Sequence, residues 1–159
     1  MKTRGPQTRN AVLLVLVLLF AVLALAIARV ITLHFFVIAA LSVVFGLLGL
    51  VLIVLTARLT ETRTQKTLFV LTGVSAAGIP VCVILHNLVY GLFIAWFGKG
   101  FWGPGGDEPV LFVLAVFVCP ALFLISAVAS GILLLKARIT RNETEPQQGA
   151  PADADKPRR

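Results

Sequence analysis

Charged residues are scarce in this sequence, and they are absent from four long stretches of it. Only 13% of the 159 residues are charged, whereas 58% are hydrophobic. That is far more apolar surface than one small water-soluble core can bury. The sequence also lacks the HExxH, GxSxG and P-loop patterns that carry common enzyme chemistries. These absences exclude a soluble globular domain, and we expect a membrane protein that is not an enzyme.

Cysteine and histidine are nearly absent as well. Cys82 and Cys119 both lie inside long apolar stretches, so the sequence contains neither a disulfide framework nor a CxxC redox pair. His34 lies near the outer end of its stretch, whereas His86 lies about eleven residues, or roughly 16 Å, below the end of its own at Phe97. Histidines at such different depths do not share a haem or a metal ion, so we expect no cofactor.

The four uncharged stretches have the length of transmembrane helices. The hydrocarbon layer of a bilayer is about 30 Å thick and takes roughly 20 apolar residues of helix to cross. Only Arg29 separates the first two stretches, and a single helix through both would reach nearly 70 Å, so the chain must turn back there. The sequence predicts an all-α, integral membrane four-helix bundle of two transmembrane hairpins within residues 11–135, with spans at 11–28, 31–56, 68–97 and 110–135.

The start of the chain also fits a cleaved signal peptide. A basic segment precedes an apolar stretch that ends in Ala24, Ala26 and Ala28, the spacing of a cleavage site. The apolar stretch is longer than that of most signal peptides, so an uncleaved first helix is the preferred interpretation. Cleavage would leave three spans and an N-terminus outside.

The distribution of Lys and Arg predicts the orientation, because positively charged loops resist translocation. Three segments hold most of the cations: Lys2, Arg4 and Arg9; Arg58, Arg63 and Lys66; Lys136, Arg138 and Arg141. We therefore expect a protein of the cell membrane with both termini in the cytoplasm, where residues 1–10 form a basic arm and residues 136–159 a disordered tail. We attribute the net charge of +7 to the membrane topology and to contact with the lipid bilayer. We expect no nucleic-acid partner.

Polar side chains are concentrated on the third span. At 100° per residue they fall within about 140° of one helix face, which we call the polar lane. Its members are Thr72, Ser75, Cys82, His86, Asn87 and Tyr90. Lipid disfavours such groups, so the lane should face other helices, either as interhelical hydrogen bonds or as a path in which His86 responds to protons. Hydrogen bonding is the preferred interpretation, because no charged residue is expected to face the lane.

Small residues recur four positions apart and allow helix backbones to approach closely. The pairs are Ser42 and Gly46, Gly73 and Ala77, Ser126 and Ser130, and Ala127 and Gly131. They predict a compact bundle and possible contacts between subunits. Pro80 and Pro120 are expected to bend the third and fourth spans. The glycine-rich segment 98–109 forms an outer loop, in which Asp107 and Glu108 are expected to be surface charges.

The second half of the chain resembles a pattern in small, uncharacterised prokaryotic membrane proteins with about four spans. The resemblance rests on His86-Asn87-Leu88-Val89-Tyr90, on Gly106-Asp107-Glu108-Pro109-Val110 and on Val118-Cys119-Pro120. It implies a recurring module and brings no activity, cofactor or site with it.

Two functions remain open from the sequence. Because the spans contain no Asp, Glu, Lys or Arg, a non-enzymatic accessory or assembly subunit is the leading hypothesis, bound to a membrane-protein partner or to further copies of itself. The alternative is a small channel or carrier whose pathway uses the polar lane.

Overall fold

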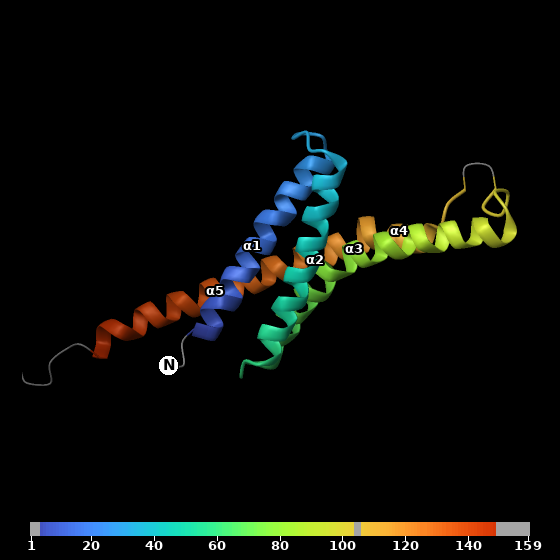
Figure 1. Ribbon diagram of the computed structural model, residues 1–159. Helices are drawn as coiled ribbons and strands as arrows, with labels where there is room; N and C mark the ends of the chain where they lie inside the picture. Colours follow the sequence, from blue (N-terminus) through green and yellow to red (C-terminus); the bar gives the residue numbers. More distant parts are fainter. Residues whose placement is uncertain (1–3, 104–105, 149–159) are drawn as a thin grey trace, which may run out of the picture.

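The computed structural model describes residues 4–103 and 106–148, and it is entirely helical apart from turns and loops. The ends of the predicted arm and tail, residues 1–3 and 149–159, lie outside the described residues. The described residues form four long helical rods. The fourth rod consists of three consecutive segments that follow one another without a break (Figure 1). The elements are α1 (Arg4–Ile27), α2 (Phe35–Ala57), α3 (Arg63–Phe97), α4 (Pro109–Val113), the π-helix η1 (Leu114–Val118) and α5 (Cys119–Gln148).

All four rods have the length and composition of membrane spans. The candidate spans are Gly5–Ile27, Phe35–Ala57, Arg63–Phe97 and Pro109–Thr140. Large apolar side chains cover their outer surfaces, as lipid contact requires; Leu14 is 60% exposed and Ile125 is 67% exposed. The predicted all-α, four-helix membrane fold is confirmed, and the chain is an integral membrane protein with four candidate spans.

The helix boundaries agree with the apolar stretches inside the spans and extend beyond them at the charged ends. The first hairpin turns at Arg29, whose φ of 57° ends α1 in a left-handed conformation. At the other end of α1, residues 4–10 of the predicted arm are already helical, and α5 continues from residue 136 to Gln148 through part of the predicted tail. A helix that is anchored by packing extends readily through Lys, Ala and Arg, because only its nucleation is unfavourable.

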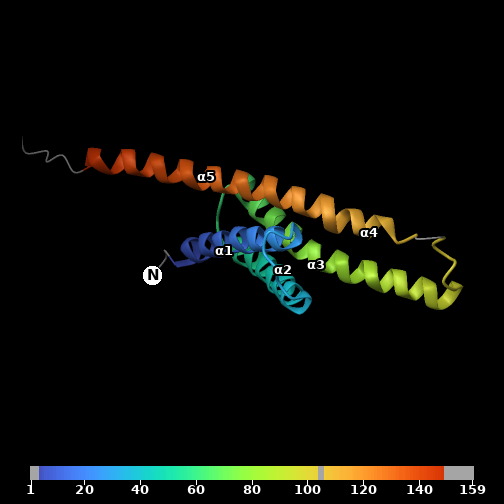
Figure 2. The same ribbon diagram turned by 90° about the horizontal axis from the view of Figure 1, so that it is seen from above.

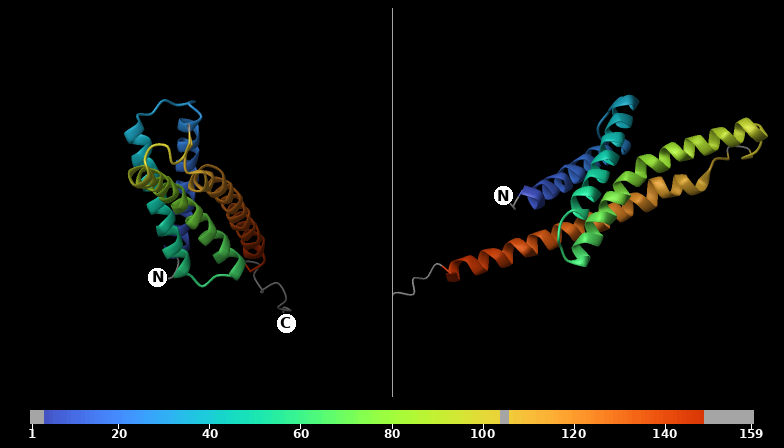
Figure 3. Two further views of the ribbon diagram at one scale, coloured as in Figure 1. Left: turned by 90° about the vertical axis from the view of Figure 1, so that its right-hand side faces the viewer. Right: turned by 60° about the horizontal axis from the view of Figure 1, so that its bottom comes forward.

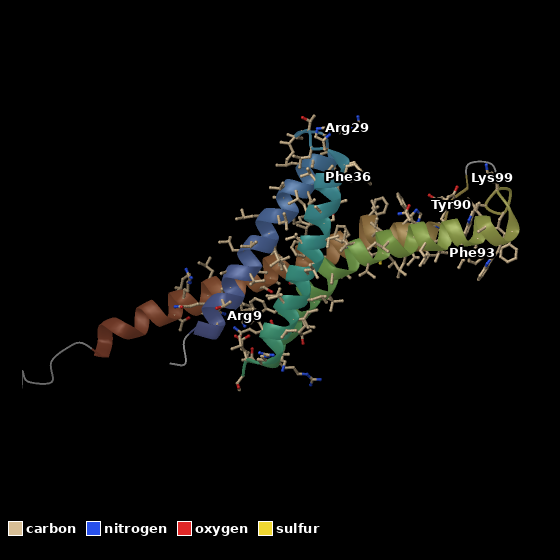
Figure 4. All side chains as sticks on the ribbon, in the orientation of Figure 1. Arg9, Arg29, Phe36, Tyr90, Phe93 and Lys99 are labelled. Carbon is tan, nitrogen blue, oxygen red and sulfur yellow. The ribbon has the colours of Figure 1, made fainter. Side chains whose placement is uncertain are left out.

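The two hairpins pack against each other near their basic ends and diverge toward their tips. The start of α1, the α2–α3 connection and the last turns of α5 lie on one side of the molecule (Figure 3). We call this side the basic end. We call residues 28–34 the first tip, and residues 98–103 with 106–108 the second tip. Arg29 and Lys99, one in each tip, are far apart (Figure 4). The predicted compact bundle is therefore found only in the basic half of the molecule.

The core forms where the hairpins cross (Figure 2). Phe45 of α2 and Phe123 of α5 are almost fully buried, and their rings pack edge to face with centroids 5.2 Å apart. Nearby, α2 and α3 approach backbone to backbone: a Cβ added to Gly49 would lie 2.7 Å from the Gly73 carbonyl oxygen. Small residues thus fix the α2–α3 crossing, as small-residue spacing allows in membranes.

Proline shapes the two helices of the second hairpin. Pro80 lies inside α3, which curves along its length (Figure 1), and it removes one backbone hydrogen bond from the helix. In the fourth rod the π-helix Leu114–Val118 comes directly before Cys119 and Pro120. A proline without an N–H group accounts for this local change of helical register.

Candidate functional site

The most concentrated polar chemistry of the described residues surrounds His86. Its Nε2 lies 3.4 Å from Oδ2 of Asp107, and its Nδ1 lies 3.3 Å from Oε2 of Glu108. The His86 side chain is 14% exposed, and Glu108 is buried. The expectation that no charge faces the polar lane is therefore wrong, and so is the assignment of Glu108 to the surface.

Local sequence holds the two carboxylates in place. Glu108 is the N-cap of α4: its Oε1 accepts a hydrogen bond from the Val110 amide at 3.0 Å, and its Oε2 accepts one from the Leu111 amide at 2.8 Å. Pro109 occupies the first turn, where no amide hydrogen is needed. The helix dipole favours a negative charge at this position. Asp107 in turn accepts a hydrogen bond from the Glu108 amide at 2.8 Å.

The His86 ring bridges the two carboxylates. One of its nitrogens faces Asp107 and the other faces Glu108, so the ring connects the second tip to α3. We call His86, Asp107 and Glu108 the tip latch.

His86 lies beside the start of the fourth rod. Its ring is 5.9 Å from the ring of Phe112. Because α3 ends at Phe97, His86 lies eleven residues, or roughly 16 Å, before the end of its helix, as expected. The last turns of α3 project past the start of α4 (Figure 4), and the Phe101 and Trp102 rings of the tip pack back against Phe93 of α3.

Aromatic rings hold the projecting part of the second hairpin together. Tyr90 of α3 stacks on Trp102 of the tip with centroids 6.3 Å apart, and Phe93 lies 5.0 Å from Phe101. Trp96 and Phe97 remain largely exposed, at 68% and 61%. The aromatic residues at this end of the hairpin thus form both the packing of the tip and an exposed apolar rim.

The remaining lane residues do not share one environment. The hydroxyl of Thr72 lies 2.9 Å from Oγ of Ser126, and both side chains are buried between α3 and α5. Ser75 is buried, and its hydroxyl has no hydrogen-bond partner among the described residues. Cys82 is a neighbour of Cys119 of α5. Only Asn87 departs from the lane: it is exposed, and its amide donates to the Val83 carbonyl of its own helix at 2.8 Å.

A second polar cluster lies at the basic end, where the sequence predicts none. Arg9 is only 2% exposed; it forms an ion pair with Glu61 of the α2–α3 connection, and its guanidinium lies 3.8 Å from the ring centroid of Phe69. The one signal in the sequence is that Glu61 is the sole carboxylate between residues 57 and 67. The cluster joins α1 to the second hairpin through a buried charge (Figure 4).

None of these clusters has the geometry of a metal centre: within residues 4–103 and 106–148, no three His, Cys, Asp or Glu side chains converge on a common point suited to a metal ion. Fold and site together define an integral membrane protein with four candidate spans and an internally latched tip. Compared with protein-family models, curated proteins and solved structures, the chain matches none of them.

Proposed function

We propose that the chain is a non-enzymatic accessory or assembly subunit of a larger membrane-protein complex. Its location is the cell membrane, with both termini in the cytoplasm as the positive-inside rule favours. The resemblance of its second half to small prokaryotic membrane proteins favours a prokaryotic membrane. The observation that carries the proposal is that most residues of the polar lane pack against other parts of the second hairpin.

Four of the six lane residues have such neighbours. Thr72 contacts Ser126, Cys82 lies near Cys119, His86 contacts Asp107 and Glu108, and Tyr90 stacks on Trp102. Asn87 bonds to its own helix, and the Ser75 hydroxyl has no partner among the described residues. Side chains that hold two helices together do not line a solute path. A groove of about 470 Å³ does run between α1 and α5, but its walls are mostly apolar and contain no lane residue. Such a groove suits lipid or a partner helix better than ions.

The second tip is the surface proposed for contact with a partner. The tip latch and the Tyr90–Trp102 stack order the segment in advance, so binding costs little conformational entropy there. Its rim exposes Trp96, Phe97 and Phe101, and aromatic side chains dominate the binding energy of protein interfaces.

A small channel or carrier remains the second candidate, because one observation favours it. The tip latch brings three ionisable groups together at the end of a span, and such groups often mark ion or proton pathways. Purified protein in liposomes, with a His86→Ala variant beside it, tests this candidate. A flux that the wild type supports and the variant lacks would replace the accessory role.

The accessory role is tested by capture from the native membrane. The tagged protein is purified in mild detergent, and the complex is identified by mass spectrometry and by its intact mass. A Phe97→Ala/Phe101→Ala variant removes two rings of the rim, and Phe117→Ala serves as the matched control, because Phe117 is 62% exposed on the fourth rod away from the tip. We expect a stoichiometric partner with the wild type and the control, and its loss with the rim variant. A chain that purifies alone in every case contradicts the proposal.

A further inference from the structure

The two cysteines of the chain, which lie on different helices, are neighbours in the structure. Cys82 is on α3 and Cys119 is the first residue of α5. Cys119 packs against α3 at Gly78, one helical turn from Cys82, and both cysteines are half-buried. No stretch of sequence links the two positions; only the antiparallel packing of α3 and α5 brings them together.

Close helix packing places Cys119 directly on α3. A Cβ added to Gly78 would lie 3.0 Å from Sγ of Cys119, so the sulfur rests against the part of α3 where a side chain is missing. Gly78 and Cys82 are four residues apart and lie on the same face of α3. The π-helix that ends at Val118 directly precedes Cys119, and such local register changes are frequent at functional sites.

We infer that Cys82 and Cys119 form a reversible intramembrane disulfide and that a lipid-soluble quinone is the class of oxidant that produces it. In this step the two S–H bonds break and one S–S bond forms. The two electrons and two protons pass to the quinone, which becomes a hydroquinone. Both cysteines are only half-buried and lie within candidate spans, so a quinone dissolved in the lipid can approach them.

A disulfide is the modification that this environment favours. The bond carries no charge, whereas a metal bound by two thiolates, or a free thiolate, would hold negative charge among apolar side chains at high free-energy cost. The bond would tie α3 to α5 between the Thr72–Ser126 contact and the tip latch, which would fix the second hairpin covalently.

The experiment uses the full chain, reduced and reconstituted in liposomes. A quinone is added, the protein is denatured, and free thiols are counted by a maleimide reagent that adds mass to each. We expect wild type to lose both free thiols, to show a mass lower by two hydrogen atoms, and to recover both thiols on reduction. Cys82→Ser and Cys119→Ser should each keep their remaining thiol.

A relocated thiol provides the matched control. The Cys119→Ser/Ile125→Cys variant keeps two cysteines but moves one to a position that is 67% exposed on α5. Without proximity we expect its oxidation to be at least about tenfold slower. Gly78→Ala, which pushes against Cys119, should slow the wild-type reaction as well.

Three results would overturn the inference. They are full alkylation of wild type after quinone treatment, a mass increase that shows a quinone adduct, and a disulfide between two chains. None of these outcomes bears on whether a partner protein is captured.

Discussion

At the scale of single residues, the two polar clusters join segments that are far apart in the chain. Hydropathy indicates how long a helix is, but it does not indicate which distant residue a side chain will meet. His86 could be placed on the third span from the sequence, whereas its contacts with Asp107 and Glu108 depend on a loop that folds back. The sequence does contain a signal for the N-cap of α4, because an acidic pair precedes Pro109 and an apolar stretch.

Arg9→Leu should lower the free energy of unfolding by about 3 kcal/mol, because it leaves the Glu61 carboxylate without its partner. Reversible unfolding in mixed micelles measures the change. Arg9→Leu/Glu61→Leu should lose less than the single variant, because no unpaired charge remains. An unchanged unfolding midpoint for Arg9→Leu would show that the buried ion pair contributes nothing.

His86→Gln should loosen the second tip, because the flexible Gln side chain lacks the rigid ring whose two nitrogens face the Asp107 and Glu108 carboxylates. Trypsin cleavage after the exposed Lys99 reports this opening. We expect cleavage in detergent to be about tenfold faster, which corresponds to about 1.4 kcal/mol of local stability. Asn87→Ala, next in sequence but on the exposed face of α3, should cleave like the wild type. Equal rates for the His86 and Asn87 variants would rule out the latch.

At the scale of helices, the sequence predicts well where the helices occur. It predicts poorly which face of a helix a given side chain lies on relative to the neighbouring helices. Four uncharged stretches and the turn at Arg29 were correctly placed, because the bilayer sets the length of a span. The membrane boundary of the third helix was harder to predict, because its apolar stretch is longer than a span and does not indicate where the membrane ends. Ideal 100° periodicity also put Asn87 in the polar lane, whereas its side chain bonds to its own helix.

The α2–α3 crossing should depend on its glycines. Gly49→Ala places a Cβ 2.7 Å from the Gly73 carbonyl oxygen and 2.9 Å from the Ala76 side chain, so the helices must separate. We expect a loss of about 2 kcal/mol in the free energy of unfolding in mixed micelles. Gly91→Ala meets nothing within 4 Å and should be neutral or stabilising by up to about 1 kcal/mol. Equal effects at the two positions would mean that the close approach does not stabilise the fold.

At the scale of the whole molecule, the structure places the three basic segments on one side, and the charge rule then predicts the orientation. The start of α1, the α2–α3 connection and the last turns of α5 share that side, as an even number of spans requires (Figure 3). Arg29 and Lys99 are the only cations at the tips. Because Lys and Arg are strongly retained in the cytoplasm, the basic end should be cytoplasmic and both tips external.

Side-specific labelling of single introduced cysteines, in a chain with Cys82→Ser and Cys119→Ser, measures this orientation in intact cells. We expect an impermeant maleimide to reach Gly100→Cys and to reach Thr64→Cys only after the membrane is opened. Both positions are exposed, so accessibility differs only by side. Labelling at position 64 in intact cells would show that the topology is the inverse of the predicted one. It would also move the rim of Trp96 and Phe97 to the cytoplasm, so the proposed partner would have to present its binding surface there.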